Sequence, residues 1–199
     1  MREKSLLLAV LLFCSGCSLD RILGGDDEDK KDDQPQTTVV SVGNDADLAL
    51  VKKYNADGNG YVDRWEQSTV GVYDQIGIPN LQEILDDWNA ALGGKLTLVR
   101  GDSQSPITIV TDTTRSLAGW TNSNIVNHRT QSAKISINTP VASLYWTTKH
   151  ELGHAVGFHG HTTAGGILNE SPTSLTITDE VKRTLRKLYD LAPGTQLVP

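Results

Sequence analysis

The chain of 199 residues has the length of one domain, and its hydrophobic content of 38% is enough to build one core. Its formal net charge of −6 argues against nucleic acid as a partner, because phosphate backbones bind basic surfaces. Both cysteines, Cys14 and Cys17, lie near the N-terminus, so the rest of the chain can form neither a disulfide nor a thiolate metal site.

Residues 1–16 have the features of an export signal. A basic start precedes an apolar run that is too short to span a bilayer as a mature helix, and Ser15-Gly16-Cys17 follows the run. This segment resembles the signal of bacterial lipoproteins, which implies that Cys17 is lipidated and becomes the mature N-terminus. Ser18 resembles the residue found at this place in outer-membrane lipoproteins, so we expect an exported protein that is lipid-anchored in the cell envelope. A plain secretory signal, and hence a secreted protein, is the alternative.

Residues 17–45 are expected to form an acidic flexible tether ahead of a folded domain that covers residues 46–199. The acidic run at residues 26–33 offers almost nothing to bury, which is typical of a solvated spacer. Binding of cations by this run is the alternative.

A stretch with the spacing of a calcium-binding loop follows a short predicted helix at residues 48–54. In residues 55–66, oxygen-bearing side chains stand at loop positions 1, 3, 5, 9 and 12, with glycine at position 6. These side chains are Asn55, Asp57, Asn59, Asp63 and Glu66. Asparagine at position 1 lowers the negative charge, and residues 69–73 favour a strand where the second helix of an EF-hand would begin. We therefore favour a turn before the first strand, with a Ca²⁺ site as the alternative.

Apolar periodicity predicts the remaining elements of an α+β fold. Apolar residues at spacings of three and four predict a helix that starts at Pro79 and stops at Gly93-Gly94. Short β-branched runs predict strands at residues 96–99, 107–111, 124–127 and 134–138. Thr139 and Pro140 are expected to begin the next helix, and Thr178 is expected to cap a C-terminal one.

The helix after Pro140 carries His150-Glu151-Leu152-Gly153-His154, which has the pattern of a zinc site with its own base. Residues four apart share one face of a helix, so the imidazoles of His150 and His154 can hold one metal ion. Catalytic zinc needs a third protein ligand and an open position for water, and Glu151 would lie beside that water to take its proton. Four of the 5 histidines fall within residues 150–161, which argues against two unrelated histidines on an ordinary helix.

These residues resemble the metzincins, and among them a matrixin-like bacterial metalloprotease. The resemblance covers about residues 70–191 and is most specific at His150-Glu151-x-x-His154-x-x-Gly157. It implies a twisted, mostly parallel mixed sheet of about five strands, with one helix on the N-terminal side, an active-site helix and a C-terminal helix. It also implies that the segment Leu117-Ala118-Gly119 approaches the edge strand and offers backbone groups to a bound peptide.

The third metal ligand departs from the family pattern. The family places a histidine three residues after the glycine, where this chain has Gly160, and His159 and His161 flank that position. We favour His161, because small hydroxyl residues follow it as in matrixins and because Gly160 would let the chain bend. His159 is the alternative. Leu168 stands in place of the methionine that lies beneath the zinc in the family, and leucine has a similar volume.

The sequence therefore predicts a hydrolase, a zinc-dependent metalloendopeptidase with one catalytic Zn²⁺ that cleaves peptide bonds of extracellular or envelope proteins. Its expected partners are a protein or peptide substrate and the membrane, and the protein is expected to be a monomer. A non-catalytic surface-binding lipoprotein that keeps the metzincin fold is the alternative, although such a protein would not need a base at Glu151.

Overall fold

The computed structural model describes residues 37–140 and 142–199. The predicted export signal, Cys17 and most of the predicted tether lie outside these residues. The described helices are α1 (Ala46–Tyr54), α2 (Leu81–Leu92), α3 (Leu144–Ala155) and α4 (Asp179–Leu188). The described strands are β1 (Val39–Ser41), β2 (Thr69–Asp74), β3 (Thr97–Arg100), β4 (Ile107–Thr111), β5 (Gly119–Val126), β6 (Arg129–Ile137) and β7 (Gln196–Val198). No helix in this part of the chain is long and apolar enough to cross a membrane.

A five-stranded sheet forms the centre of the fold, with the strand order β3-β2-β4-β6-β5. Strands β3, β2, β4 and β6 run parallel to their neighbours, and β5 runs antiparallel to β6. The predicted α+β class with a mostly parallel mixed sheet of five strands is therefore confirmed. β5 is the last strand in this order and packs against α3, so the edge of the sheet lies beside the helix that carries the histidines.

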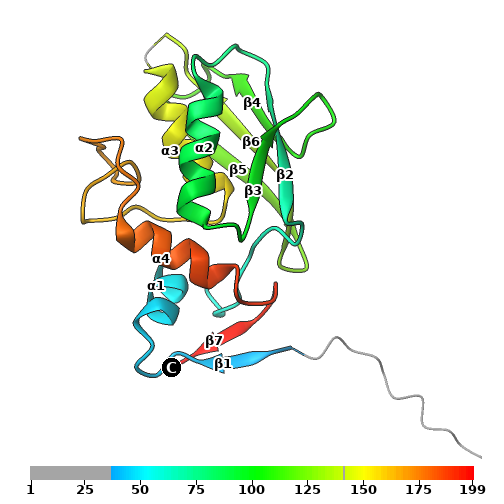
Figure 1. The fold of residues 1–199 in the computed structure, drawn as a ribbon, viewed down its shortest axis with the longest axis vertical. Coiled ribbons are helices and arrows are strands. Elements are labelled where there is room, and N and C mark those ends of the chain that lie inside the picture. The colour runs from blue at the N-terminus through cyan, green and yellow to red at the C-terminus, as the bar shows by residue number, and fades with distance from the viewer. Residues whose placement is uncertain (1–36, 141) are drawn as a thin grey trace, which may run out of the picture. The chain divides into compact units, whose positions relative to one another are not determined.

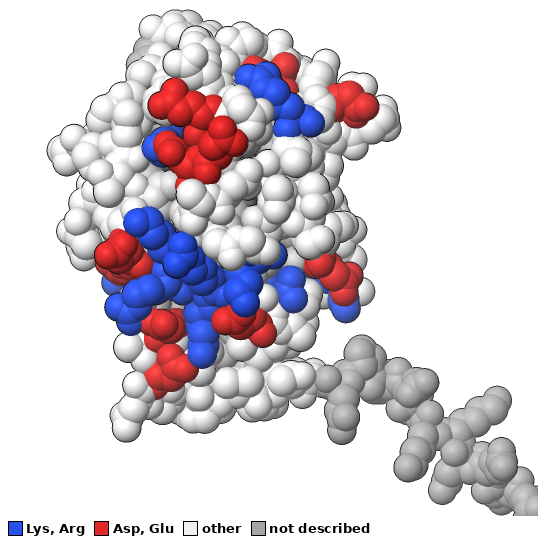
Figure 2. Space-filling model, viewed as in Figure 1, with Lys and Arg blue, Asp and Glu red and all other residues white. Residues whose placement is uncertain are grey.

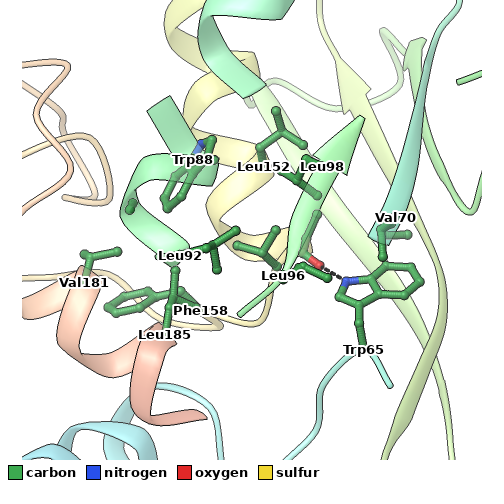
Figure 3. Close-up of a cluster of buried hydrophobic side chains, with 14 of the residues drawn as sticks. Trp65, Val70, Trp88, Leu92, Leu96, Leu98, Leu152, Phe158, Val181 and Leu185 are labelled. Carbon is green, nitrogen blue, oxygen red and sulfur yellow. Dashed lines mark hydrogen bonds between the residues drawn. The ribbon is translucent and has the colours of Figure 1, made fainter. Parts of the chain in front are cut away.

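Helices α2 and α3 pack side by side on one face of the sheet (Figure 1). The apolar face of α2 buries Leu85, Trp88 and Leu92. The helix ends where Gly93 adopts a left-handed conformation with a φ of 62°, as the sequence predicted. In Figure 3, Trp88 and Leu92 belong to the same apolar cluster as Leu152 of α3, so packing of side chains fixes α3 on the sheet.

Helix α4 packs against α1 and α2. Thr178 caps its first turn through its side chain, as predicted. Figure 2 shows lysine and arginine side chains gathered over α4. Two of them bind acidic residues at the start of α1: Arg183 pairs with Asp47, and Nζ of Lys187 lies 2.9 Å from Oδ2 of Asp45. Exposed ion pairs contribute little to stability, so the apolar contacts of α4 hold the two helices together.

Strand β1 pairs in parallel with β7 and joins the two ends of the described chain. Val40 lies opposite Leu197, whose side chain is buried. The tether expected over residues 17–45 therefore ends before β1, and residues 39–41 belong to the folded domain. A strand of three residues is too short to show an alternating pattern, so only its distant partner reveals it.

The start of α3 also differs from the sequence prediction. Thr139 and Pro140 do not begin the helix, and Ser143 is its N-cap residue. The amide of Asn138 donates to the backbone oxygen of Ala118 at 2.9 Å, so the chain stays attached to the segment before β5 up to this point. The chain therefore leaves the sheet only after Asn138, and α3 begins later than predicted.

Candidate metal centre

Helix α3 places His150 and His154 on one of its faces, one turn apart. Nδ1 of His150 lies 2.6 Å from the backbone oxygen of Ile167, and Nδ1 of His154 lies 2.6 Å from that of Phe158. A carbonyl oxygen only accepts hydrogen bonds, so each Nδ1 must carry the ring proton. Each Nε2 therefore presents a lone pair, which is the form of imidazole that binds a metal ion.

Three imidazoles meet beside α3. Nε2 of His150 lies 3.0 Å from Nε2 of His154 and 3.2 Å from Nε2 of His161. Zinc–nitrogen bonds of about 2.0–2.1 Å at tetrahedral angles would place two ligand nitrogens roughly 3.3 Å apart, so the observed spacing fits a shared ion. The facing lone pairs of His150 and His154 also repel each other unless a cation lies between them. Among the described residues, these three histidines form a group that could bind a metal ion.

The structure brings His161, and not His159, to this group. The chain reverses at Gly157, whose φ of 106° lies in the region that glycine favours. The chain also bends at Gly160, but without a positive φ, so this bend does not use the conformation that only glycine favours. A Cβ at residue 160 would lie 3.1 Å from Cδ1 of Tyr54, so a side chain there would press on the Tyr54 ring. Metal binding by His161 itself stays a prediction.

Burial keeps the two helix histidines neutral. It lowers the pKa of His154 to about 4 and lowers the pKa of His150 below its ordinary value. The nearby His161 acts in the same direction on both. Ligand imidazoles must be unprotonated, so these environments favour metal binding at neutral pH.

Glu151 places a buried carboxylate next to the three histidines. Its Oε2 accepts a hydrogen bond of 2.7 Å from Oγ1 of Thr121, a residue of β5. Burial raises the pKa of Glu151 to about 7, and the hydrogen bond from Thr121 opposes this rise. A carboxylate with a pKa near neutrality is suited to taking and returning a proton. Sequence reasoning missed Thr121, because only the packing of β5 against α3 places it here.

A cleft of about 680 Å³ opens at the histidines and Glu151. The segment Leu117-Ala118-Gly119 lines it, and substrate binding by this segment stays a prediction. Gly119 is the first residue of β5, so this segment leads into the edge strand instead of lying beside it. The other residues that line the cleft are Trp120, Thr121, Ser123, Ile125, Trp146, Thr147, His159, Glu170 and Pro172.

Gly119 also permits the close approach of β5 to α3. A Cβ at this residue would lie 2.5 Å from Cγ2 of Thr147 and 3.1 Å from Oε1 of Glu151. Any side chain at residue 119 would therefore push the edge strand away from the carboxylate.

Leu168 packs against the helix that carries the metal group. It is fully buried, and a Cβ at Gly153 of α3 would lie 2.6 Å from its Cδ2 atom. The preceding residue, Ile167, provides the carbonyl that orients the ring of His150. This segment therefore supports the site by packing and by one hydrogen bond, which suits the role expected for Leu168.

Four of the five oxygen-bearing side chains of residues 55–66 have separate partners. Asn55 bonds to Asp63 and Gly157, Asp57 to the amides of Asn59 and Tyr61, Asp63 to His128, and Glu66 to Arg129. In the part of the chain that the structure describes, the group able to hold a metal ion includes none of these loop residues. The contacts favour the turn over the Ca²⁺ site.

The sequence was compared with known proteins. No model of a known protein family matches it, and a search of curated proteins finds no similar sequence.

Proposed function

We propose that this chain is a zinc-dependent metalloendopeptidase with a metzincin fold of the matrixin type. One observation carries the proposal: the Nε2 atoms of His150, His154 and His161 converge beside the buried carboxylate of Glu151, at an open cleft. Structural zinc sites have four protein ligands, whereas three leave a position for water. A carboxylate beside that position is the group that a hydrolase needs.

Zinc and the chain's own residues would have separate roles in the hydrolysis of a peptide bond. Zinc, when bound by the three histidines, supplies a Lewis acid that polarises the scissile carbonyl and makes water nucleophilic near neutral pH. Glu151 takes a proton from the attacking water as the water oxygen adds to the carbonyl carbon. It then gives the proton to the amide nitrogen as the C–N bond breaks. Thr121 donates to Oε2 of Glu151, and we assign the role of base to the other oxygen, Oε1.

The substrate we propose is an extended segment of a protein or peptide that lies along β5. The edge of a sheet presents backbone N–H and C=O groups to which another strand can add. β5 is the last strand of the described sheet, and the cleft is lined by its residues Gly119, Trp120, Thr121, Ser123 and Ile125. Leu117 and Trp146 add apolar surface for substrate side chains. A protein exported to the cell envelope would meet envelope or extracellular proteins as substrates.

Cleavage of casein by the purified protein tests the proposal. We expect a zinc chelator to abolish cleavage and added zinc to restore it. Glu151→Ala should keep its zinc and lose a factor of about 10² to 10⁴ in rate, the usual contribution of a general base. Asp86→Ala, which removes an exposed carboxylate of α2, is the matched control and should cleave like the parent.

Two results would count against the proposal. Cleavage that survives both the chelator and Glu151→Ala would exclude a zinc peptidase. Tight zinc binding without cleavage of casein, gelatin or a mixed peptide library would favour the non-catalytic surface-binding lipoprotein.

A further inference from the structure

The C-terminal end of α3 is held by three side chains from distant parts of the chain and by one of its own. Four consecutive backbone oxygens, at residues 155–158, each accept one side-chain hydrogen bond. Trp65 Nε1 donates to Ala155 at 2.8 Å, Tyr189 Oη to Val156 at 3.0 Å, Asn55 Nδ2 to Gly157 at 2.8 Å and His154 Nδ1 to Phe158 at 2.6 Å. The dashed line in Figure 3 marks the bond from the Trp65 indole. The last carbonyls of a helix lack partners inside the helix, so a buried helix end needs such donors.

Asn55 makes more side-chain hydrogen bonds than the other three of these residues. It is 3% exposed, and its Nδ2 donates to the backbone oxygen of Asp63 at 2.7 Å as well as to that of Gly157. Its Oδ1 accepts from the amide of Asp63 at 3.0 Å. The neighbouring residue Tyr54 accepts a hydrogen bond of 2.7 Å from the amide of His159 through its backbone oxygen. The turn after α3 is thus fixed to the end of α1 at two adjacent residues.

This turn controls two members of the metal group. Phe158, whose carbonyl orients the ring of His154, directly follows the residue that Asn55 holds. His161 follows Gly157 by four residues, so its approach to His150 passes through the same turn. A shift of the carbonyl at residue 157 would move both imidazoles relative to His150.

We propose that Asn55, together with Tyr189, positions the metal centre by holding the turn at Gly157, so that His154 and His161 face the bound zinc. The inference rests on the proposed zinc site, and it does not depend on peptide cleavage. Groups that orient metal ligands without touching the metal change metal affinity by about 10- to 100-fold when they are removed. Asn55 is therefore a positioning residue, although its sequence context resembles the first position of a calcium loop.

Asn55→Asp separates this role from calcium binding. Aspartate has nearly the same shape, but its carboxylate cannot donate, so it would face the carbonyls of Asp63 and Gly157 without hydrogen bonds. In a calcium loop the same substitution would strengthen the site, because the first position is normally aspartate. A positioning role for Asn55 thus predicts that Asn55→Asp disturbs the turn and weakens zinc binding. A calcium site predicts that the same variant binds calcium more tightly.

The rate of zinc release from the purified protein into an excess of a colorimetric chelator tests the inference. We expect Asn55→Asp to release zinc at least about tenfold faster than the parent. We also expect it to change the visible spectrum of the Co²⁺-substituted protein, which reports ligand geometry and which a general loss of stability would leave unchanged. Asp57→Asn is the matched control, since Asp57 is exposed in the same loop and bonds to the amides of Asn59 and Tyr61. It should release zinc at the parent rate.

Several results would overturn the inference. One is a folded Asn55→Asp protein whose zinc release rate and cobalt spectrum are both unchanged. Another is a melting temperature of this variant that rises with millimolar calcium. If Asn55→Asp does not fold, Tyr189→Phe, which removes only the donor to Val156, takes its place, and zinc release at the parent rate would overturn the inference. A parent that binds no zinc would overturn both proposals, whereas a zinc-bound parent that cleaves no peptide would overturn only the proposed function.

Discussion

At the scale of the residue, the hydrogen bond from Thr121 lowers the pKa of Glu151 against the larger effect of burial. Burial raises the pKa of Glu151 to about 7 and the hydroxyl lowers it, so removal of the hydroxyl must raise it further. A general base must be ionised, so we expect Thr121→Val to move the acidic limb of the kcat/KM profile to higher pH. Relative to the parent, the activity of Thr121→Val should fall more at acidic pH than at alkaline pH.

The pH profile of casein or peptide cleavage checks this prediction. Thr121→Ser keeps a hydroxyl and is the control, with an acidic limb close to that of the parent. A Thr121→Val profile that overlies the parent profile would show that the carboxylate does not depend on this contact.

The choice of the third ligand is also a matter of single residues. His161 contributes its Nε2 to the group of three imidazoles, and His159 does not. Loss of one of three ligands weakens zinc binding and raises the pKa of bound water. We therefore expect His161→Ala to lose zinc and activity together, and His159→Ala to keep most of both. Elemental analysis of the two purified variants measures the zinc, and the reverse pattern would assign the ligand to His159.

At the scale of the element, α3 must lie close to the segment at Leu168. A Cβ at Gly153 would lie 2.6 Å from Cδ2 of Leu168 and 2.8 Å from Cη2 of Trp88. Both neighbours are fully buried, so Gly153→Ala should overpack the core and lower the free energy of unfolding by about 1–3 kcal/mol. Urea unfolding measures this loss. Gly58→Ala, where a Cβ would meet nothing within 4 Å, is the control, and equal stability of the two variants would contradict the prediction.

The helices could be predicted from local signals better than the strands. The apolar face and left-handed Gly93 of α2, and the Thr178 cap of α4, lie within the helices or next to them. Strand β5 begins at Gly119, five residues before the predicted start at residue 124, because its first half contains glycine and polar residues. Pairing with β6 defines that half, and pairing partners are not local.

The candidate site also combines residues that a local pattern predicts with residues that only distant contacts bring to it. The spacing of His150, Glu151 and His154 is local to one helix, and the motif alone predicts their common face. Thr121 contacts Glu151 across 30 residues of sequence, and Asn55 contacts Gly157 across 102. No short sequence pattern indicates contacts between residues that lie so far apart in the chain. In residues 55–66 the local pattern resembled a calcium loop and left Ca²⁺ open as the alternative to a turn, because turns use the same polar residues as metal binding.

At the scale of the whole molecule, α3 belongs to both the core and the site, because it buries Leu152 and Ala155 in the core and places His150 and His154 in the cleft. Its side chains pack with α2 against the sheet, and its last carbonyls are held by Trp65, Asn55 and Tyr189 from segments before and after the sheet. The geometry of the histidine group therefore depends on segments that precede and follow the sheet in the chain. Destabilising those segments should loosen the metal group before it unfolds the sheet.

We predict that the mature protein is held at a membrane through lipidated Cys17. A charged start, an apolar run and Ser15-Gly16-Cys17 occur together ahead of an acidic stretch that has little to bury. A single acyl chain binds a membrane only marginally, whereas the several chains of a bacterial lipoprotein hold firmly. Cell fractionation should therefore place the parent with the membranes. Cys17→Ala should move it to the soluble fraction without changing its zinc content, since the metal group lies more than a hundred residues away in sequence. A parent found wholly in the soluble fraction would contradict the anchor and favour a secreted protein.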